Sequence, residues 1–166
     1  MKTKVEFVKA EVSDFETIQR LAYEIWPVCY SAIISMDQIE YMLRLLYAPS
    51  ALANEAENGQ NFFFMLENKV PIGFLGITRK EKNRLKLDKL YLSESHRGKG
   101  YGKEMMAFVE REAKRLEAKF LFLNVNRFNH TLDFYKKMGF EIELNLDIPF
   151  GPFWLNDFVM VKKLDF

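Results

Sequence analysis

A junction between a strand and a helix at residues 85–102, which read LKLDKLYLSESHRGKGYG, constrains the fold most. Its first eight residues are rich in Leu and Tyr, which is typical of a strand. A polar turn and a basic loop with three glycines follow. Apolar residues then recur at helical spacing, at Met105, Met106, Val109, Ala113 and Leu116. The loop is therefore predicted to lie where a strand leads into a helix.

This glycine loop, residues 97–102, has the composition of an anion-binding site. The first turn of a helix leaves N–H groups without partners and carries partial positive charge, so it normally favours acidic neighbours. Here the charged neighbours are Arg97, Lys99 and Lys103. Gly98, Gly100 and Gly102 tolerate positive φ and place no Cβ between the backbone and a ligand. The sequence thus predicts that the loop amides bind phosphate oxygens.

Two other phosphate-binding loops do not match this spacing. A Walker loop has four residues between its glycines and Ser or Thr after its Lys. Three residues separate Gly98 from Gly102, and Glu104 follows Lys103. The Rossmann pattern lacks its third glycine here and usually opens the first βα unit of its domain. Taken alone, the loop leaves open the alternative of a solvated basic turn.

The composition restricts the size and class of the protein. The chain of 166 residues, 49% of them hydrophobic, fits one domain over residues 1–166 with a sizeable core. A net charge of +1 predicts no general attraction to nucleic acid or an acidic membrane, and no apolar run has the length of a membrane span. The single cysteine, Cys29, excludes an internal disulfide and suits a reducing compartment, so we expect a cytoplasmic protein. The two His are scattered, and no metal site is expected.

Helical and strand patterns both occur along the chain, which indicates an α+β domain with a mixed sheet. Capping signals at Ser13 with Glu16 and at Ser35 with Gln38 open two helices, the first ending before Pro27. Further helices are expected at residues 50–57, 103–116 and 129–138. Strands are expected at residues 5–8, 62–66, 72–78, 85–92, 120–125, 140–146 and 158–161.

Three details of the strands carry further expectations. Gly73 and Gly76 indicate a bulge or a close neighbour within one strand. The prolines at 149 and 152 are expected to end the strand before them. The last strand, residues 158–161, is expected to form an exposed edge through which two copies pair as a homodimer.

Two motifs in the chain resemble those of the GNAT N-acetyltransferase superfamily. RGKGYG matches its Arg/Gln-x-x-Gly-x-Gly/Ala loop, and Asn129 with the following FYKKMGF is similar to its second motif. The resemblance covers essentially the whole chain and implies a mostly antiparallel sheet of about seven strands flanked by helices. The segments IWPVCYSAIISMDQIEYML and NDFVM resemble, more weakly, the branch that contains polyamine acetyltransferases.

The resemblance also implies an acetyl-CoA site. The amides of Arg97, Gly98, Lys99, Gly100, Tyr101 and Gly102 would hold the diphosphate of the cosubstrate. The backbone at Leu90 and Leu92 would pair with the pantetheine arm, Asn129 would hydrogen-bond to it, and Tyr135 would face the sulfur. Asn129 lies six residues before Tyr135, where many members have seven, so Asn126 is the alternative.

The implied reaction is direct attack of an amine on the acetyl thioester. An alkyl amine of pKa near 10.4 needs about 4.6 kcal/mol to become neutral at pH 7, so the site needs a proton acceptor. Asp88 and Glu24 are the two candidates. The phenol of Tyr135 can protonate the departing thiolate, and an N–H of Leu90 or Leu92 can stabilise the oxyanion. No covalent intermediate is required, so Cys29 need not be a nucleophile.

The acceptor and the alternatives stay open at this point. The acceptor is a small amine, a polyamine or a peptide amine, and a polyamine would favour a pocket lined by carboxylates. The acids considered are Glu24, Asp37, Glu40, Asp88 and Asp157. Trp26, Tyr30 and Phe153 either line an acceptor pocket or belong to the core. A non-catalytic CoA-binding sensor is the alternative function, while the balanced charge disfavours a nucleic-acid-binding protein.

Overall fold

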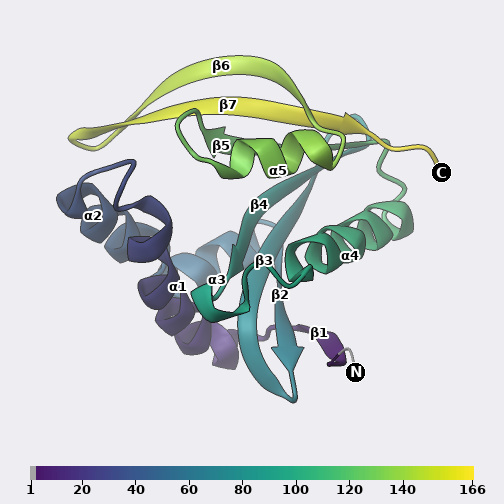
Figure 1. The fold of residues 1–166 in the computed structure, drawn as a ribbon, viewed down its shortest axis with the longest axis horizontal. Coiled ribbons are helices and arrows are strands. Elements are labelled where there is room, and N and C mark those ends of the chain that lie inside the picture. Colours follow the sequence, from purple (N-terminus) through teal and green to yellow (C-terminus); the bar gives the residue numbers. More distant parts are fainter. Residues whose placement is uncertain (1–2) are drawn as a thin grey trace.

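The computed structural model, which describes residues 3–166, contains one seven-stranded sheet with the strand order β1-β2-β3-β4-β5-β7-β6 (Figure 1). The strands are β1 (Val5–Lys9), β2 (Gln60–Glu67), β3 (Val70–Lys80), β4 (Arg84–Leu92), β5 (Phe120–Asn126), β6 (Glu141–Phe150) and β7 (Phe153–Lys163). The helices are α1 (Phe15–Tyr30), α2 (Met36–Leu46), α3 (Pro49–Glu57), α4 (Tyr101–Arg115) and α5 (Thr131–Lys137), with short 3-10 turns η1 (Val12–Asp14) and η2 (Glu94–His96). The predicted α+β fold with a mostly antiparallel sheet is confirmed.

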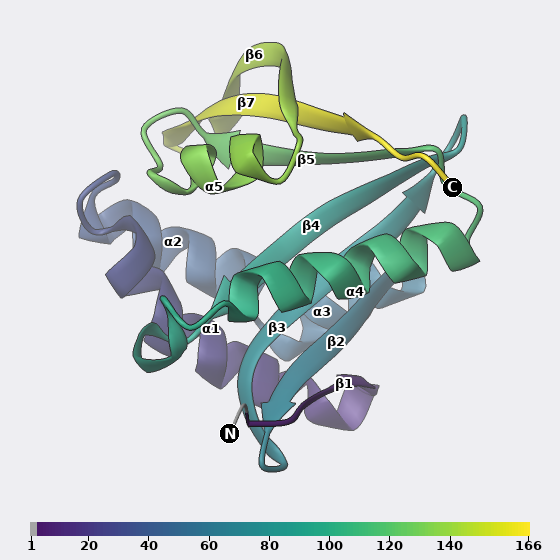
Figure 2. The ribbon, with the colours of Figure 1, turned by 45° about the vertical axis from the view of Figure 1, so that its right-hand side comes forward.

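The sheet divides where β4 meets β5, its one parallel pair. Residues 84–86 pair with residues 120–122, and the pairing stops there. Figure 2 shows the two strands side by side near the C-terminus and separating toward their other ends. The part of β4 beyond residue 86 therefore has a partner only in β3, and its other edge faces the gap between the strands.

A bulge in β4 reverses which side chains face each side of the sheet. Gly76 pairs with Lys89 and Ile77 with Leu87, so Asp88 is the additional residue on β4. Before the bulge, Leu85 and Leu87 face the helix α4 side. After it, Leu90 and Leu92 face that side instead. The bulge thus keeps apolar residues of both parities in one core.

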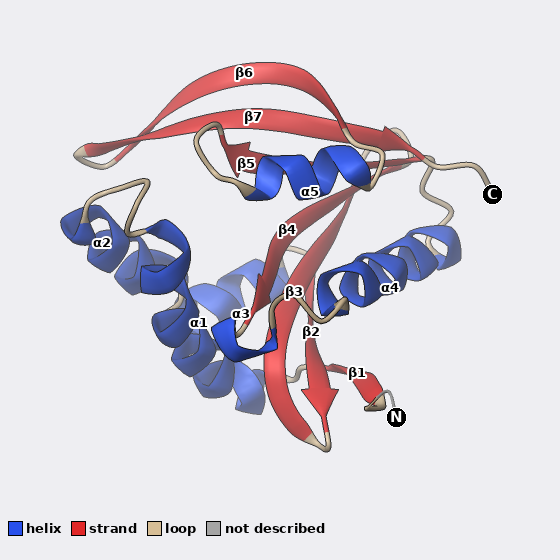
Figure 3. Cartoon of the chain, in the orientation of Figure 1, coloured by secondary structure: helices blue, strands red, loops and turns tan. Residues whose placement is uncertain are grey.

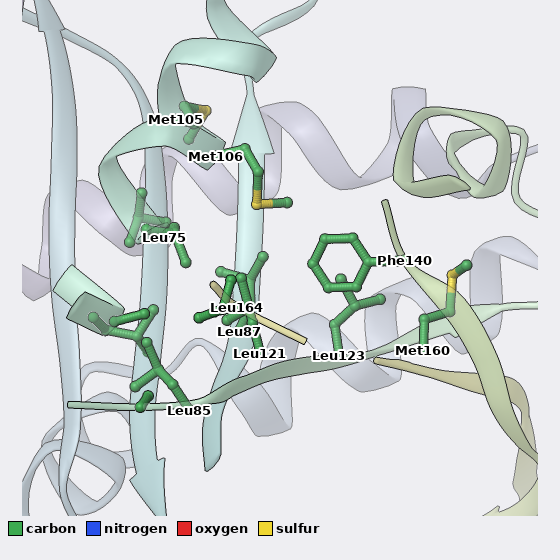
Figure 4. Close-up of a cluster of buried hydrophobic side chains, with 14 of the residues drawn as sticks. Leu75, Leu85, Leu87, Met105, Met106, Leu121, Leu123, Phe140, Met160 and Leu164 are labelled. Atoms are coloured by element: carbon green, nitrogen blue, oxygen red, sulfur yellow. The ribbon is translucent and has the colours of Figure 1, made fainter. Parts of the chain in front are cut away.

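The sheet has a core on each face. One core lies between the sheet and α4, and Figure 4 shows Met105 and Met106 of α4 above Leu75, Leu87 and neighbouring strand residues. The other lies beneath the N-terminal helices, which cover the opposite face (Figure 3). Its most enclosed members include Ile18, Ile39, Leu52 and Phe74, each of which is fully buried.

The N-terminal helices differ from the prediction at two points. The capping box is formed by Glu11 and Asp14 around η1, and not by Ser13 with Glu16. Helix α1 continues past Pro27 to Tyr30. Pro27 lies in the last turn, and the carbonyl that its ring leaves unpaired belongs to Tyr23, whose side chain is exposed, so the loss of one hydrogen bond is tolerated.

Helix α2 begins as predicted. The Ser35 hydroxyl accepts a hydrogen bond from the Gln38 N–H at 3.1 Å.

Among the residues 3–166, no helix is long and apolar enough to cross a membrane.

The last two strands correct the prediction for the C-terminal region. Strand β6 runs through Pro149 to Phe150, because an edge strand has only one neighbour and a missing N–H costs it no ladder bond. Strand β7 starts at Phe153 and lies between β5 and β6. The expected exposed edge at residues 158–161 is therefore wrong, and so is the homodimer contact proposed there. The edges of the sheet are β1 and β6.

Candidate active site

A cavity of about 730 Å³ opens where β4 and β5 separate. Residues from α1, α2, α3, β2, β4, the glycine loop, α4, β5, α5, β6 and β7 line it. Ten of the residues predicted to bind the cosubstrate or to catalyse the reaction line it, namely Asp88, Leu90, Leu92, Arg97, Gly98, Gly100, Gly102, Asn126, Asn129 and Tyr135. The glycine loop and the second motif therefore line the same cavity.

The backbone of the glycine loop has the conformation that glycine permits. Gly98 has φ +74 and Gly100 has φ +86, and a Cβ at either position would meet no other atom within 4 Å. The backbone angle, and not space, therefore requires glycine at these two positions. Gly100 caps α4 without a side-chain hydrogen bond, so the amides of the first turn face the loop without an internal side-chain partner.

Arg97 is directed back into the structure. Its Nη2 lies 2.7 Å from the Cys29 sulfur at the end of α1, and its Nε donates to the Leu92 carbonyl at 3.4 Å. Burial raises the pKa of the Cys29 thiol, and the charge of Arg97 opposes that rise. Arg97 thereby connects the glycine loop to both α1 and the end of β4.

Two members of the glycine loop do not line the cavity, Lys99 and Tyr101. The Tyr101 side chain is 6% exposed and its hydroxyl donates to the Glu67 carboxylate. Lys99 lies near enough to Glu67 for its charge to lower the pKa of that carboxyl. These two side chains therefore face the β2 side of the loop, and only their backbone amides remain candidates for the diphosphate.

Asn126 and Asn129 both shape the turn between β5 and α5. The Asn129 side-chain oxygen accepts from the Thr131 N–H at 2.9 Å, at the start of α5. The Asn126 side-chain oxygen accepts from the Phe128 N–H, also at 2.9 Å. In both residues the oxygen is used within the chain, so the side-chain NH2 group is the part that a ligand would meet. The geometry does not choose between them.

Tyr135 lies on α5 and lines the cavity together with Tyr30 of α1 and Tyr91 of β4. Its ring packs against Phe134 and Phe140, with centroids at 5.3 and 5.8 Å. The hydroxyls of Tyr30 and Tyr91 are hydrogen-bonded at 2.8 Å. Burial raises the pKa of Tyr30, Tyr91 and Tyr135 above that of an ordinary phenol. All three phenols are therefore protonated at neutral pH.

Only one of the two candidate bases, Asp88, lies in the cavity wall. Asp88 lines the cavity, accepts from the Thr78 hydroxyl at 2.5 Å and lies 3.9 Å from the Lys86 ammonium. Glu24 pairs with Arg20 at 3.2 Å on the outer face of α1, with 58% of its side chain exposed, and is not part of the cavity wall. The structure does not bring Glu24 to the site, and we do not retain it as a base.

Asp157 on β7 is a carboxylate that the sequence suggested only as part of an acidic pocket. It lines the cavity and pairs with Asn126 in the β5–β7 ladder. Burial raises the pKa of its carboxyl, against a hydrogen bond from Asn124 and the charges of Arg127 and Lys86. It forms no ion pair with another residue of the described chain. An acid placed in an apolar strand, FWLNDFVM, was the signal that could have identified it.

The other expectations for the pocket separate in the same way. Trp26 and Tyr30 line the cavity and also belong to the core on that face, whereas Phe153 packs on Tyr41 away from the cavity wall. Asp37 and Glu40 do not line it. No group of three or more metal-ligating side chains occurs among the residues that the structure describes.

A buried lysine beside the bulge, Lys89, was not predicted from the sequence. Lys89 is 8% exposed, and its ammonium donates to Glu55 of α3 and Gln60 of β2, each at 2.8 Å. The rings of Tyr47 and Phe62 lie 5.8 and 5.3 Å from it. This network holds β2 and α3 against β4 directly after Asp88.

Comparison with known proteins decides the family. Residues 16–140 match the model of the acetyltransferase (GNAT) family. The chain belongs to this family. A GNAT relative, the spermine/spermidine N(1)-acetyltransferase of Bacillus subtilis, is 30% identical over 86 residues, which are 51% of this chain. The match spans 53%, or about half, of the length of that relative.

Solved GNAT structures share the whole fold. The PaiA N-acetyltransferase of Thermoplasma acidophilum, solved in complex with coenzyme A, is 29% identical with a TM-score of 0.83 over 97% of this chain and 99% of that one. A GCN5-related N-acetyltransferase from Rhodopseudomonas palustris has the same TM-score of 0.83 at 17% identity, over 99% of both chains. The second likeness establishes the fold alone.

Proposed function

We propose that the protein is an N-acetyltransferase that passes an acetyl group from acetyl-CoA directly to a primary amine. The observation that carries this proposal is the parting of β4 from β5. It leaves one cavity that joins a glycine loop at a helix N-terminus to a protonated tyrosine. The coenzyme A complex of the Thermoplasma acidophilum relative supports the cosubstrate.

The residues of the cavity fit coenzyme A. The amides of the glycine loop, with Arg97 and Lys103 beside them, would hold the diphosphate at the N-terminus of α4. The free edge of β4 at Leu90 and Leu92 would pair with the amides of the pantetheine arm. The side-chain NH2 of Asn129, or of Asn126 in its place, would donate to the same arm.

Tyr135 would supply the proton that the departing thiolate needs. Its phenol is protonated at neutral pH, and its position on the cavity wall gives it access to the thiolate. An N–H of the β4 backbone at Leu90 or Leu92 would stabilise the oxyanion of the tetrahedral intermediate.

Asp157 is the carboxylate best suited to receive the proton of the attacking amine, with Asp88 as the alternative. The carboxylate of Asp88 already accepts a hydrogen bond from the Thr78 hydroxyl and lies 3.9 Å from the Lys86 ammonium. Asp157 has no ion-pair partner within residues 3–166, and burial strengthens its affinity for a proton. Brønsted behaviour therefore favours Asp157.

The carboxylates on the cavity wall support a cationic acceptor. Glu55, Asp88 and Asp157 line it, and the first two already have cationic partners in Lys89 and Lys86. Asp157 is therefore the acid left for an alkylammonium group. Polyamines are the first acceptors to test, because the Bacillus subtilis relative is named for them.

The test is release of CoA thiol from acetyl-CoA by the purified protein, with polyamines, amino acids and short peptides as parallel acceptors. Tyr135→Phe should lower kcat by about 10²–10⁴-fold and leave the Kd for acetyl-CoA unchanged. Tyr23→Phe is the control, because Tyr23 is 46% exposed on α1 and does not line the cavity.

Two results would contradict the proposal. Binding of acetyl-CoA without turnover on any amine would favour the CoA-binding sensor. A Tyr135→Phe variant with the wild-type kcat would remove this tyrosine from the chemistry.

A further inference from the structure

The two ends of the glycine loop contact one carboxylate from a distant part of the chain. Glu67 is the last residue of β2, at the β2–β3 turn. Its Oε1 lies 3.4 Å from Nε2 of His96, which directly precedes the loop. Its Oε2 accepts a hydrogen bond from the hydroxyl of Tyr101, the first residue of α4. One side chain thus connects the entrance of the loop to its exit.

The loop between these two contacts has little support of its own. Gly98 and Gly100 have the largest backbone freedom of any residue type, and a Cβ at either position would touch nothing. Backbone hydrogen bonds fix the loop near its ends, from Arg97 N–H to Glu94 and from Glu104 N–H to the Gly100 carbonyl. Amides that must converge on an anion bind it more tightly when they are held in place beforehand.

The side of His96 that faces away from Glu67 is held by Ser93. Its Nδ1 lies 2.6 Å from the Ser93 hydroxyl, and the Ser93 N–H donates to the Ile72 carbonyl of β3 at 2.8 Å. The Ser95 hydroxyl also lies near this Nδ1, at 3.1 Å. The other ring nitrogen, Nε2, faces the Glu67 carboxylate. The Ser93–Ser95 segment thus holds one edge of the His96 ring, while Glu67 contacts the other edge.

The charge of Glu67 is secured by its neighbours. Its pKa is lowered, first by the hydrogen bond from Tyr101 and then by His96 and Lys99. Glu67 is thus a carboxylate at neutral pH, able to accept from both partners at once. It does not line the cavity, so it would not touch the cosubstrate.

We infer that Glu67 is a positioning residue, which holds His96 and Tyr101 so that the glycine loop keeps the geometry that binds a diphosphate. The inference rests on the proposed function, since it takes the diphosphate of acetyl-CoA as the ligand of the loop. Nothing in the local sequence around Glu67 marks it, because its partners lie 29 and 34 residues away.

Glu67→Gln tests the inference with an isosteric change. The amide oxygen can accept from one partner, while the NH2 that replaces the second oxygen cannot. We expect the Kd for acetyl-CoA, measured by calorimetry, to rise about tenfold, which corresponds to about 1.4 kcal/mol. KM for acetyl-CoA should rise in parallel while kcat at saturation stays unchanged, a split that general destabilisation would not produce.

The sign of the effect separates positioning from electrostatics. Removing a negative charge near an anion site should by itself strengthen diphosphate binding. Glu81→Gln, at the exposed β3–β4 turn, removes the same charge away from the loop and is the matched control. Weaker binding in Glu67→Gln, with no weakening in Glu81→Gln, is the expected pattern.

If Glu67→Gln folds poorly, Tyr101→Phe tests the same contact, because it deletes only the hydroxyl that donates a hydrogen bond to Glu67. The double variant should lose less binding free energy for acetyl-CoA than the two single variants lose together, because both substitutions remove the same contact.

A Glu67→Gln variant that binds acetyl-CoA as tightly as the wild type, or more tightly, overturns the inference and leaves the proposed function intact. Absence of binding in the wild type overturns the proposed function. In that event hydrogen exchange of the amides of residues 97–102 decides the positioning role, since Glu67→Gln must accelerate it. Unchanged exchange there also overturns it.

Discussion

Gly73→Ala should disturb both the stability of the protein and its acetyl-CoA site. Gly73 pairs with Leu92 across β3 and β4. A Cβ at Gly73 would lie 2.5 Å from the Tyr91 carbonyl oxygen and 3.3 Å from the Leu92 Cα. Both are backbone atoms, so no rotation of a side chain can relieve the contact. The end of β4 must move away from β3.

The size of the effect follows from this displacement. Bringing the 2.5 Å contact to the 3.0 Å at which real contacts begin requires a shift of at least 0.5 Å. Overpacking of this kind costs about 1–3 kcal/mol. For a chain of this length, that lowers Tm by about 2–12 °C. The same shift moves the β4 edge proposed to bind pantetheine, so kcat/KM for acetyl-CoA should fall about tenfold or more.

The assay combines thermal unfolding with initial rates. Gly102→Ala is the control for stability, because its Cβ would lie 3.5 Å from the Phe134 ring, an ordinary contact, at a helical residue. It should unfold at the wild-type temperature or above it. If Gly73→Ala unfolds together with the wild type and keeps its kcat/KM, the close approach of β3 and β4 does not constrain the site.

Three further predictions concern Asp157 and Lys89. If Asp157 is the base, activity should fall with decreasing pH around an apparent pKa above the ordinary Asp value, and Asp157→Asn should abolish that limb of the profile; a limb that survives would assign the base elsewhere. Burial raises the pKa of Asp157 in the folded state, so the folded protein binds more protons than the unfolded chain does. The contribution of Asp157 to the free energy of unfolding is therefore greatest below its unfolded pKa and declines as the pH rises to its folded pKa. Urea unfolding of the Asp157→Asn variant should lack this decline. Lys89→Met leaves Glu55 without its cation and should destabilise the fold by about 3–5 kcal/mol in urea unfolding, whereas adding Glu55→Gln should restore part of the loss; no restoration would contradict the pairing.

The parts of the site that the sequence predicted are those set by local chemistry. Glycine at positions 98 and 100 is required by the backbone angles of one short loop, and that requirement is legible in the loop itself. The cap at Ser35 is equally local. Tyr135, which lines the cavity, was singled out because a second local motif surrounds it.

The surroundings of other residues near the site depend on which elements meet in space, and these could not be predicted from the sequence. Asp157 faces the cavity because β7 inserts between β5 and β6, an order that no pattern within β7 specifies. Glu67 and Lys89 acquire their roles from partners on other strands and helices. Pro149 misled the prediction because proline ends a central strand but is tolerated at an edge, and the position of a strand in the sheet is not a local property.

The short parallel contact between β4 and β5 makes the cavity sensitive to events far from it. From residue 86, where the pairing ends, β4 extends six residues to Leu92, or about 20 Å at 3.3 Å per residue. A pivot of about 3° at that contact would move the far end of β4 by about 1 Å, enough to change the alignment of reacting groups. Arg84 fastens the pivot, with its guanidinium 4.5 Å above the Phe122 ring and 2.9 Å from Glu143. An arginine at the opposite end of the strand thus links β4 to β5 and β6 at the contact from which the cavity opens.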